Sequence, residues 1–217
     1  MLLGRVKKVI SGLVALSMLT TFAVPSGMVK AADSSELKNP VVSKTETTWD
    51  RVVFGSYYSE VQEKDVPITW RVLNVSGNDA FLISDEILAM KNYNDEAKAV
   101  TWADSSLRSW LNDDFFNYAF TEEERAAVIQ TEIQNNNFDL TQTDYETTND
   151  YVYLPSYQEM QLKSYGFSNN ILDHESRLAY TNTYLEASNI DDTDDPADDS
   201  TDIGAQWLLR TNGENRN

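Results

Sequence analysis

The chain contains no cysteine among its 217 residues. This absence excludes disulfide bonds, thiolate metal ligands and cysteine nucleophiles. Histidine is nearly absent as well: the single His174 lies between Asp173 and Glu175, a polar setting typical of a surface residue rather than of a catalytic base. No Ser-His-Asp order, phosphate-binding loop or metal-ligand signature is present either. The sequence therefore predicts neither a metal centre nor a bound cofactor.

Basic residues are also scarce. Lys and Arg number 17 against 35 Asp and Glu, for a formal net charge of −18. Four of the bases, Arg5, Lys7, Lys8 and Lys30, lie in the first 31 residues, which contain no acid, so the remainder carries −22. A chain this acidic repels phosphate backbones and anionic lipid, which argues against nucleic acid and anionic membranes as partners. It suits cations, basic partners or neutral ligands such as glycans.

The first 31 residues have the pattern of a secretory signal peptide. Three basic residues precede a largely apolar run from Val9 to Val24, and Val29-Lys30-Ala31 places small residues at the −3 and −1 positions of a cleavage site. We expect cleavage after Ala31 or Ala32 and a secreted or cell-surface protein that has no membrane contact afterwards. The alternative is an uncleaved membrane anchor. No later segment is long and apolar enough to span a bilayer, and cysteine-free export is typical of a Gram-positive surface.

Residues 32–48 are polar and are expected to form a leader, and residues 49–217 a single extracellular domain. Strands are predicted over Arg51–Tyr57 and Tyr151–Leu154, with a last strand over Gln206–Arg210. Alternation in Pro67–Val72 and the apolar run Ala80–Ser84 predict a hairpin with the four-residue loop 76–79. The order of elements predicts an α+β fold, with an antiparallel or mixed sheet and flanking short helices.

The stretch Thr101–Asn112 contains the main predicted helix, which is expected to start at Ser105. Asp104 is expected to cap its start, and Leu107, Trp110 and Leu111 fall at i, i+3 and i+4, which places them on one apolar face. The aspartates at 113–114 are expected to weaken the helix at its negative end.

A second face of this helix carries Arg108 and Asn112, with Trp102 just before the helix. Two interpretations remain open. The helix is buried against a sheet, with Arg108 pairing to a carboxylate, or Trp102, Arg108 and Asn112 form the wall of a ligand pocket.

Two capping boxes mark further helix starts, Thr121 with Glu124 and Ser156 with Glu159. The first predicts a helix whose apolar face continues to Ile133. The second predicts a helix to about residue 165. Residues 135–150 are polar and are predicted to form a loop.

Several of these segments recur together in a known family. The order of these segments resembles that in a family of secreted bacterial domains of unknown function, which is common in Gram-positive anaerobes. More distantly, the pattern resembles the sulfatase-modifying-factor and C-type-lectin-like fold. The resemblance implies that fold and an attachment to immunoglobulin-like or cell-wall-binding modules. The matching segments are Pro67–Leu73, Ile83-Ser84, Tyr93-Asn94, Trp102 with Ser106–Asn112, Ala119–Thr121 with Glu124, Leu154–Glu159 and Trp207–Arg210.

The chain departs from the family pattern in three places. Pro155 stands where an apolar strand residue is usual, an acidic insert occupies Asp191–Asp202, and the sequence stops at Asn217 where the family continues through further strands. The resemblance therefore implies a domain that is incomplete at its C-terminus. Formylglycine-generating chemistry requires cysteines, so it does not carry over.

The leading functional hypothesis is a non-catalytic surface module that binds a glycan or a surface protein. The five tryptophans and eleven tyrosines offer flat surfaces for such ligands. The candidate ligand-binding residues are Trp102, Arg108, Asn112, Trp207 and Arg210. One alternative is a secreted carbohydrate-active hydrolase with paired carboxylates, although chance pairs are abundant among 35 acids. The other alternative is a structural surface domain without a ligand.

The acidic insert Asp191–Asp202 predicts no tight Ca²⁺ site. It lacks the glycine and the glutamate that an EF-hand loop requires, so Ca²⁺ should bind only weakly, through relief of repulsion between carboxylates. Titration calorimetry checks this. A micromolar affinity that Asp→Asn changes in the insert abolish would contradict the prediction.

Overall fold

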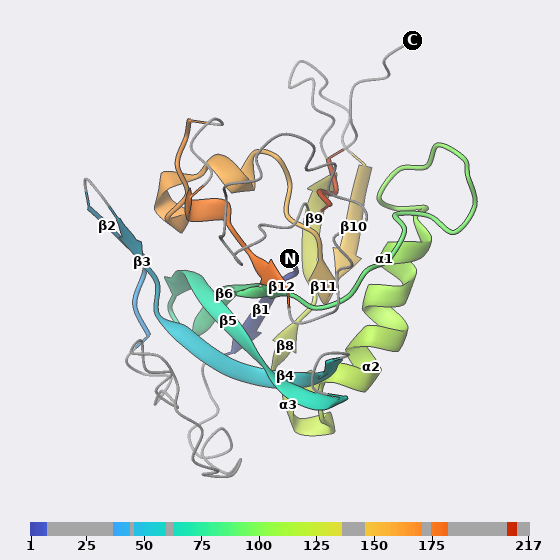
Figure 1. Cartoon of the computed structure of the whole chain (residues 1–217), viewed down its shortest axis with the longest axis horizontal. Helices are drawn as coiled ribbons and strands as arrows, with labels where there is room; N and C mark the ends of the chain where they lie inside the picture. Colours follow the sequence, from blue (N-terminus) through green and yellow to red (C-terminus); the bar gives the residue numbers. More distant parts are fainter. Residues whose placement is uncertain are drawn as a thin grey trace, which may run out of the picture.

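The computed structural model describes residues 1–7, 37–43, 46–59, 63–135, 146–170, 175–181 and 208–211. They form an α+β fold whose main sheet has the strand order β11-β1-β6-β5-β4, with β8 also paired to β1. The helices lie at one end of the curled β4–β5 ribbon (Figure 1). The predicted fold class is therefore confirmed at this level. The strands of the sheet are β1 (Leu3–Lys7), β4 (Arg51–Ser59), β5 (Lys64–Ser76), β6 (Asp79–Ser84), β8 (Val128–Ile129) and β11 (Val152–Tyr153).

The predicted hairpin is confirmed, with a tighter turn than expected. Strands β5 and β6 pair antiparallel as far as Ser76 opposite Asp79, so the turn holds two residues instead of four. Gly77 has a φ of 55°, a conformation that two-residue hairpin turns require and that glycine adopts without strain. All residues of β6 from Ala80 to Ser84 are buried, because other elements cover both faces of this strand.

Strand β4 runs through Gly55 instead of ending there. Its register with β5 shifts between Val53 and Ser56, and Gly55 has a φ of 72°. A Cβ atom at this position would lie 2.6 Å from the Phe120 ring. The amide of Gly55 donates to Glu124 Oε1 at 2.9 Å. The bulge therefore lets the helical layer approach the sheet closely.

Strand β1 lies within the sequence assigned to the signal peptide. It pairs antiparallel with β6 over five residues, from Leu3 opposite Ile83 to Lys7 opposite Asp79. Its other edge pairs with β11 at Leu3 and Gly4 and with β8 at Arg5 and Val6. The first seven residues thus form an interior strand of the sheet, whereas residues 8–36 lie outside the described ranges.

Three helical segments follow one another without a break, namely α1 (Ser106–Trp110), the π-helical η2 (Leu111–Phe115) and α2 (Phe116–Ala119). The helix departs from regular α geometry over Leu111–Phe115, the segment that contains the two aspartates expected to weaken it. The helix widens into a π turn there and continues, because Phe115, Phe116 and Ala119 are all buried, and their packing outweighs the poor helix propensity of aspartate.

The helix capped by Thr121 is shorter than predicted. The capping box forms, but α3 (Glu122–Ala127) ends where Val128 becomes extended. Residues 128–129 form β8 and pair with β1, and Ile133 lies in β9 (Thr131–Asn135), which pairs with β10 (Glu146–Asp150). The predicted loop over 135–150 is therefore wrong for residues 146–150. These β-branched segments take strand partners that are distant in sequence, which the local helical pattern does not reveal.

The second capping box also forms. The Ser156 amide donates to Glu159 and the Glu159 amide to the Ser156 hydroxyl, at 2.8 and 3.1 Å. It is followed by two 3₁₀ turns, η3 (Glu159–Gln161) and η4 (Lys163–Tyr165), instead of one α-helix. Gly166 then adopts a φ of 87°, where a Cβ atom would lie 2.6 Å from Trp49 Nε1. The close approach of Trp49 therefore requires glycine at the end of η4.

The remaining elements are short. They are β2 (Val41–Val42), β3 (Thr47–Thr48), β7 (Glu86–Ile87), η5 (Glu175–Arg177) and β12 (Tyr180–Thr181). The β2–β3 hairpin lies in the region predicted to be a polar leader. Strand β12 pairs with β7 in parallel. Of the predicted last strand only Leu208–Arg210 is described, and these residues are not in a strand.

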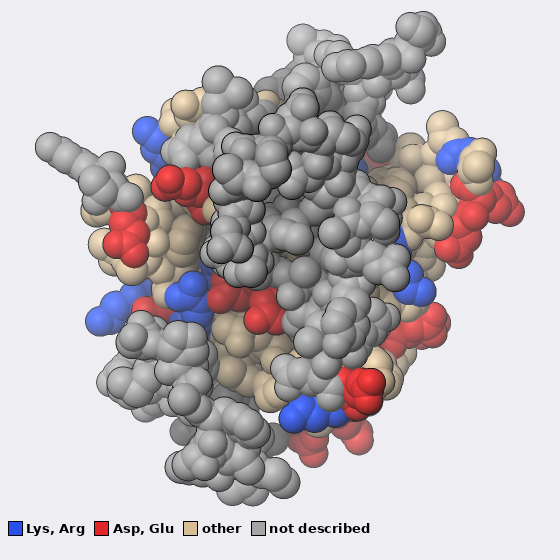
Figure 2. All heavy atoms as spheres, viewed as in Figure 1, with Lys and Arg blue, Asp and Glu red and all other residues tan. Residues whose placement is uncertain are grey.

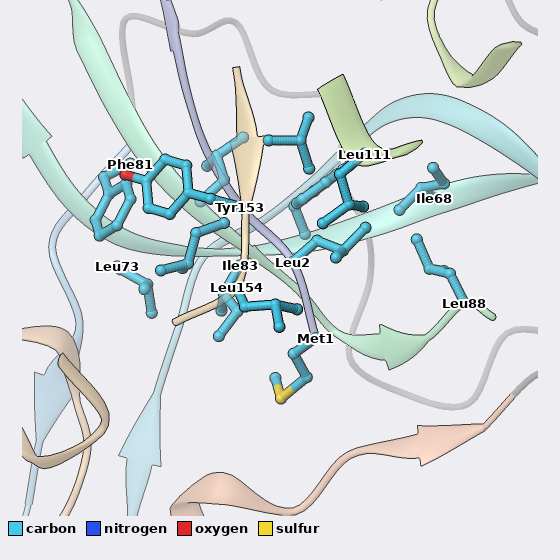
Figure 3. Packing of buried hydrophobic residues seen from close by; sticks show 14 of the residues in the cluster. Met1, Leu2, Ile68, Leu73, Phe81, Ile83, Leu88, Leu111, Tyr153 and Leu154 are labelled. Atoms are coloured by element: carbon cyan, nitrogen blue, oxygen red, sulfur yellow. The ribbon is translucent and has the colours of Figure 1, made fainter. Parts of the chain in front are cut away.

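One hydrophobic core lies between the sheet and the helices. Met1, Leu2 and Leu3 are part of it, together with residues from β5, β6, η2 and β11. Figure 3 shows Leu2 near the centre of this cluster and Met1 below it. The α-amino group of Met1 is buried with them, and desolvation lowers its pKa from 8.0 to about 5.

The buried amine predicts a pH dependence of stability. Between pH 5 and pH 8 the unfolded chain binds the proton and the folded chain does not, so the free energy of unfolding should rise with pH and level off above pH 8. At 1.36 kcal/mol per pKa unit the rise is on the order of 4 kcal/mol. Denaturant titrations of the full chain across this range measure it. Acetylation of the N-terminus should remove this part of the dependence, and identical profiles for the two forms would contradict the burial.

Candidate functional site

The α1–η2 helix carries the residues that the sequence marks as a candidate site. Its N-cap is Ser105 and not the predicted Asp104: the Ser105 hydroxyl accepts the Arg108 amide at 3.1 Å, while Asp104 is exposed. Ser105 is buried and its own hydroxyl donates to the Trp102 carbonyl. The cap therefore also fixes Trp102 against the helix start.

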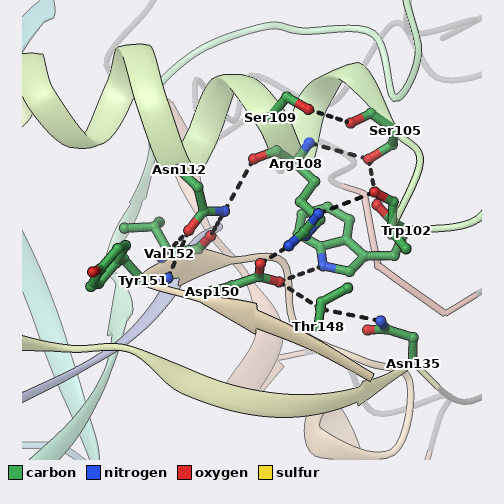
Figure 4. A network of polar contacts seen from close by, with 11 residues as sticks. Trp102, Ser105, Arg108, Ser109, Asn112, Asn135, Thr148, Asp150, Tyr151 and Val152 are labelled. Carbon is green, nitrogen blue, oxygen red and sulfur yellow. Dashed lines mark hydrogen bonds and ion pairs between the residues drawn. The ribbon is translucent and has the colours of Figure 1, made fainter. Parts of the chain in front are cut away.

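Asp150, the last residue of β10, faces the polar side of this helix and is the shared acceptor of three side chains (Figure 4). The carboxylate is fully buried and accepts Trp102 Nε1 at 2.8 Å, Arg108 Nε at 2.7 Å and the Thr148 hydroxyl at 2.8 Å. A buried carboxylate is tolerated only when it is paired and hydrogen-bonded, as here. The arrangement joins the helix to β10.

Asn112 joins the same helix to β11. Its side-chain amide donates to the Val152 carbonyl at 3.0 Å, and its oxygen accepts the Tyr151 amide at 2.7 Å. It also donates to the Arg108 carbonyl at 3.0 Å. A single asparagine thus serves as the hydrogen-bonding partner of the β11 backbone on the side facing the helix.

Arg210 occupies a separate position beside the residues that follow β11. It is buried, donates to the Leu154 carbonyl at 2.7 Å and pairs with Glu159 at 2.5 Å. Its guanidinium lies 5.4 Å from the centre of the Tyr153 ring. Trp207, the other candidate from this motif, lies outside the described residues, as do His174 and the acidic insert.

The structure therefore brings Trp102, Arg108 and Asn112 together and places Arg210 apart from them. The first interpretation of the helix, with Arg108 on a carboxylate, matches this geometry. Each of the four residues makes side-chain bonds within the chain, and these bonds hold the helix and the Ser156–Glu159 turn onto β10 and β11. A role for them in ligand binding remains a prediction.

A third charged cluster surrounds Asp85, the residue that follows the end of β6. Arg51 and Arg71 both pair with Asp85, the first at 2.7 Å. Burial acts to raise the pKa of Asp85, but the two guanidinium groups outweigh it and hold this pKa below its ordinary value. Arg71 also donates to the Leu178 carbonyl at 3.0 Å. The cluster joins β4 and β5 to the segment after η5.

The apolar face of the α1–η2 helix lines an open pocket. Leu107, Trp110 and Leu111, which the sequence places on one face, all contribute to it. The pocket has a volume of about 540 Å³. Its other lining residues are Met1, Leu2, Ile87, Leu88, Ala89, Met90, Lys91, Asn92, Asp95, Phe115, Leu154 and Leu208.

Trp110 is half-buried in this pocket instead of being fully in the core. Its ring contacts Tyr57 edge-on and Phe115 at a tilt, with centroid distances of 6.4 and 5.5 Å. Lys91 Nζ lies 4.9 Å from the ring centre, a distance typical of a cation–π contact. Trp110 therefore anchors one wall and supplies part of the pocket surface.

Another wall of the pocket comes from the segment after β7, which the sequence does not mark as a site. This wall is held by the helix start: the Leu107 amide donates to the Tyr93 carbonyl at 3.3 Å, and the Asp95 amide donates to the Ser106 hydroxyl at 2.8 Å. The sequence gives little indication that this segment forms a pocket wall, since Lys91, Asn92 and Asp95 are residue types common on protein surfaces. Only the neighbouring Tyr93-Asn94 belongs to the matching segments.

Residues 77–217 match a family described as a domain of unknown function, DUF6273. The chain belongs to this family. The match contains the α1–η2 helix, Asp150 and Arg210, whereas β1, β4 and β5 precede it. No curated protein and no solved structure matches the chain.

No helix within the described residues is long and apolar enough to cross a membrane. No group of three or more His, Asp or Glu side chains within the same residues is placed to hold a metal ion.

Removal of the Asp150 carboxylate should destabilise the fold strongly. Asp150→Ala leaves Trp102, Arg108 and Thr148 without their shared partner, and we expect a loss of roughly 3–5 kcal/mol, as for other broken buried pairs. Thermal and denaturant unfolding measure it. Asp104→Ala is the matched control, because this exposed residue is not the cap, and it should change stability by less than about 0.5 kcal/mol. Equal effects of the two substitutions would show that Asp150 does not hold the helix.

Proposed function

We propose that the chain is an exported, non-catalytic module that binds a glycan or a surface protein through the pocket beside Trp110. The observation that carries the proposal is the pocket itself, a concave and mostly apolar surface with a few polar groups, which is the usual composition of a binding site. A secreted location and the C-type-lectin-like character of the fold are parts of this proposal, supported by the sequence pattern alone.

The lining favours a surface protein over a glycan. Sugars need several hydrogen-bonding groups, yet the charged and amide side chains of the lining are limited to Lys91, Asn92 and Asp95. Lys91 also covers the Trp110 ring, so a stacked sugar would have to displace it. Apolar side chains of a protein partner would instead meet exposed Met90 and Leu208, which are 60% and 43% exposed.

The lining also favours binding over hydrolysis. Glycosidases use two carboxylates that face each other across the substrate, and Asp95 is the single carboxylate among the described residues that line the pocket. Among the described residues visible in Figure 2, acidic and basic side chains both occur around the face. Contact with the partner is therefore expected to depend on apolar burial more than on charge.

Binding of the labelled chain to the surface of the cells that produce it tests the proposal. We expect protease treatment of the cells to remove binding and periodate oxidation of their glycans to leave it. Met90→Asp should weaken binding at least tenfold, because it places a charge in the apolar pocket. Leu162→Asp is the control, since Leu162 is an exposed apolar residue, 41% exposed, outside the pocket lining.

Three results would redirect the proposal. Binding lost to periodate but not to protease would assign the ligand to glycans. Release of reducing sugars by the chain would support the hydrolase alternative. Equal weakening by Met90→Asp and Leu162→Asp would contradict the pocket as the binding surface.

A further inference from the structure

Strand β1 is the only backbone connection between the two halves of the main sheet among the described residues. Strands β8 and β11 pair with β1 and not with β6. The Ser84 amide donates to the Leu2 carbonyl, and the Leu2 amide donates to the Ser84 hydroxyl, both at 2.9 Å. Without Met1–Lys7, a groove with hydrogen-bonding groups on both edges would lie between β6 on one side and β8 and β11 on the other.

The groove requires a particular kind of strand. Met1 to Gly4 are buried, Val6 is half-buried, and Arg5 and Lys7 are exposed. Arg5 lies over the Phe81 ring at 5.6 Å, and Lys7 is paired in register with Asp79. An occupant therefore has an apolar first half and basic exposed residues in its second half, which suits the −22 charge of the chain after residue 31.

Residues 1–7 fill this groove imperfectly at two points. A free α-amino group is buried at Met1, which desolvates a group that is charged at neutral pH. An apolar gap of about 10 Å³ lies beside Gly4, between Phe54, Trp70 and Phe120. A Cβ atom at residue 4 would meet the Tyr151 carbonyl at 3.4 Å, an ordinary contact. A strand without a free amine and with alanine at this position would therefore fit better.

The groove also continues beyond the end of β1. Met1 and Leu2 line the 540 Å³ pocket, so an occupant that extends past the position of Met1 would enter open space. The first seven residues coincide with the start of the predicted signal peptide, whose cleavage after Ala31 or Ala32 would remove β1. The same residues cannot be both a discarded export signal and a permanent interior strand.

We propose that the position of β1 is an acceptor groove, and that in the exported chain it takes an extended apolar strand, flanked by basic residues, from another polypeptide. The incoming strand runs antiparallel to β6 and supplies the backbone bonds that β8 and β11 otherwise lack. Such strand addition is a known mode of peptide recognition, in which main-chain bonds give affinity and alternate side chains give specificity. This inference rests on the export assumed in the proposed function, and because Met1 and Leu2 line the Trp110 pocket, the occupant of the groove also shapes that pocket.

The test uses the full chain with a protease recognition sequence inserted between Lys7 and Leu37. After cleavage of the folded protein, the first segment is itself a separate polypeptide. We expect it to remain bound through gel filtration and to exchange with a labelled acetyl-MLLARVK-amide peptide, which lacks the free amine and carries Gly4→Ala. The anisotropy of the label reports uptake. The same peptide with Leu3→Asp should bind at least tenfold more weakly, because Leu3 is fully buried.

Two controls make the outcome decisive. The uncut chain should take up neither peptide, since its groove is occupied. Light scattering of the uncut chain should show a monomer, and a dimer whose copies exchange β1 would assign the groove to a second copy and overturn the proposal. A cut chain that neither retains its first segment nor takes up the labelled peptide would also overturn it, as would equal binding of the peptides with and without the Leu3→Asp change.

Discussion

The continuity of the main sheet depends on one strand of five residues. Strand β1 supplies the backbone partners of β6 on one edge and of β8 and β11 on the other. Backbone N–H and C=O groups buried without partners are strongly unfavourable, so the sheet requires an occupant at this position. Because Met1, Leu2 and Leu3 also belong to the hydrophobic core, the same strand contributes both hydrogen bonds and apolar burial.

Side-chain bonds hold the helices onto this sheet. Asp150 collects Trp102, Arg108 and Thr148, and Asn112 pairs with the backbone of β11. These bonds orient the α1–η2 helix so that the side chains on its polar face bond to groups within the protein. Its opposite face, which carries Trp110, is left to line the pocket. The residues most prominent in the sequence motif thus act on the fold, and the surface available to a ligand lies on the other side of the same helix.

Local patterns predicted much of this arrangement. The i, i+3, i+4 spacing placed Leu107, Trp110 and Leu111 on one face, and both capping boxes formed as expected. The hairpin of β5 and β6 was also predictable, because alternation and a turn glycine are local signals. The α+β class followed from the order of these elements, and pairing of Arg108 with a carboxylate was one of the two interpretations of the helix.

Non-local partners account for what the sequence did not reveal. Nothing near Asp150 distinguishes it from the other 34 acids, since its role arises from Trp102, which is 48 residues away. Strands β8 and β10 are short and acquire their conformation from pairing with distant segments. Strand β1 combines apolar and basic residues, as the start of a signal peptide does. An interior strand of a sheet can have the same composition, so the sequence pattern alone does not distinguish a signal peptide from a strand.

Hydrogen exchange at the β6 amides tests the central claim most directly. In the full chain, the Ser84 amide and the interior amides of β6 should be among the slowest to exchange, because β1 and β5 cover both edges of this strand. Deletion of residues 1–7 should remove the protection of the amides that face β1, while those that face β5 remain protected. Rapid exchange of the Ser84 amide in the full chain, or unchanged protection after the deletion, would contradict the account.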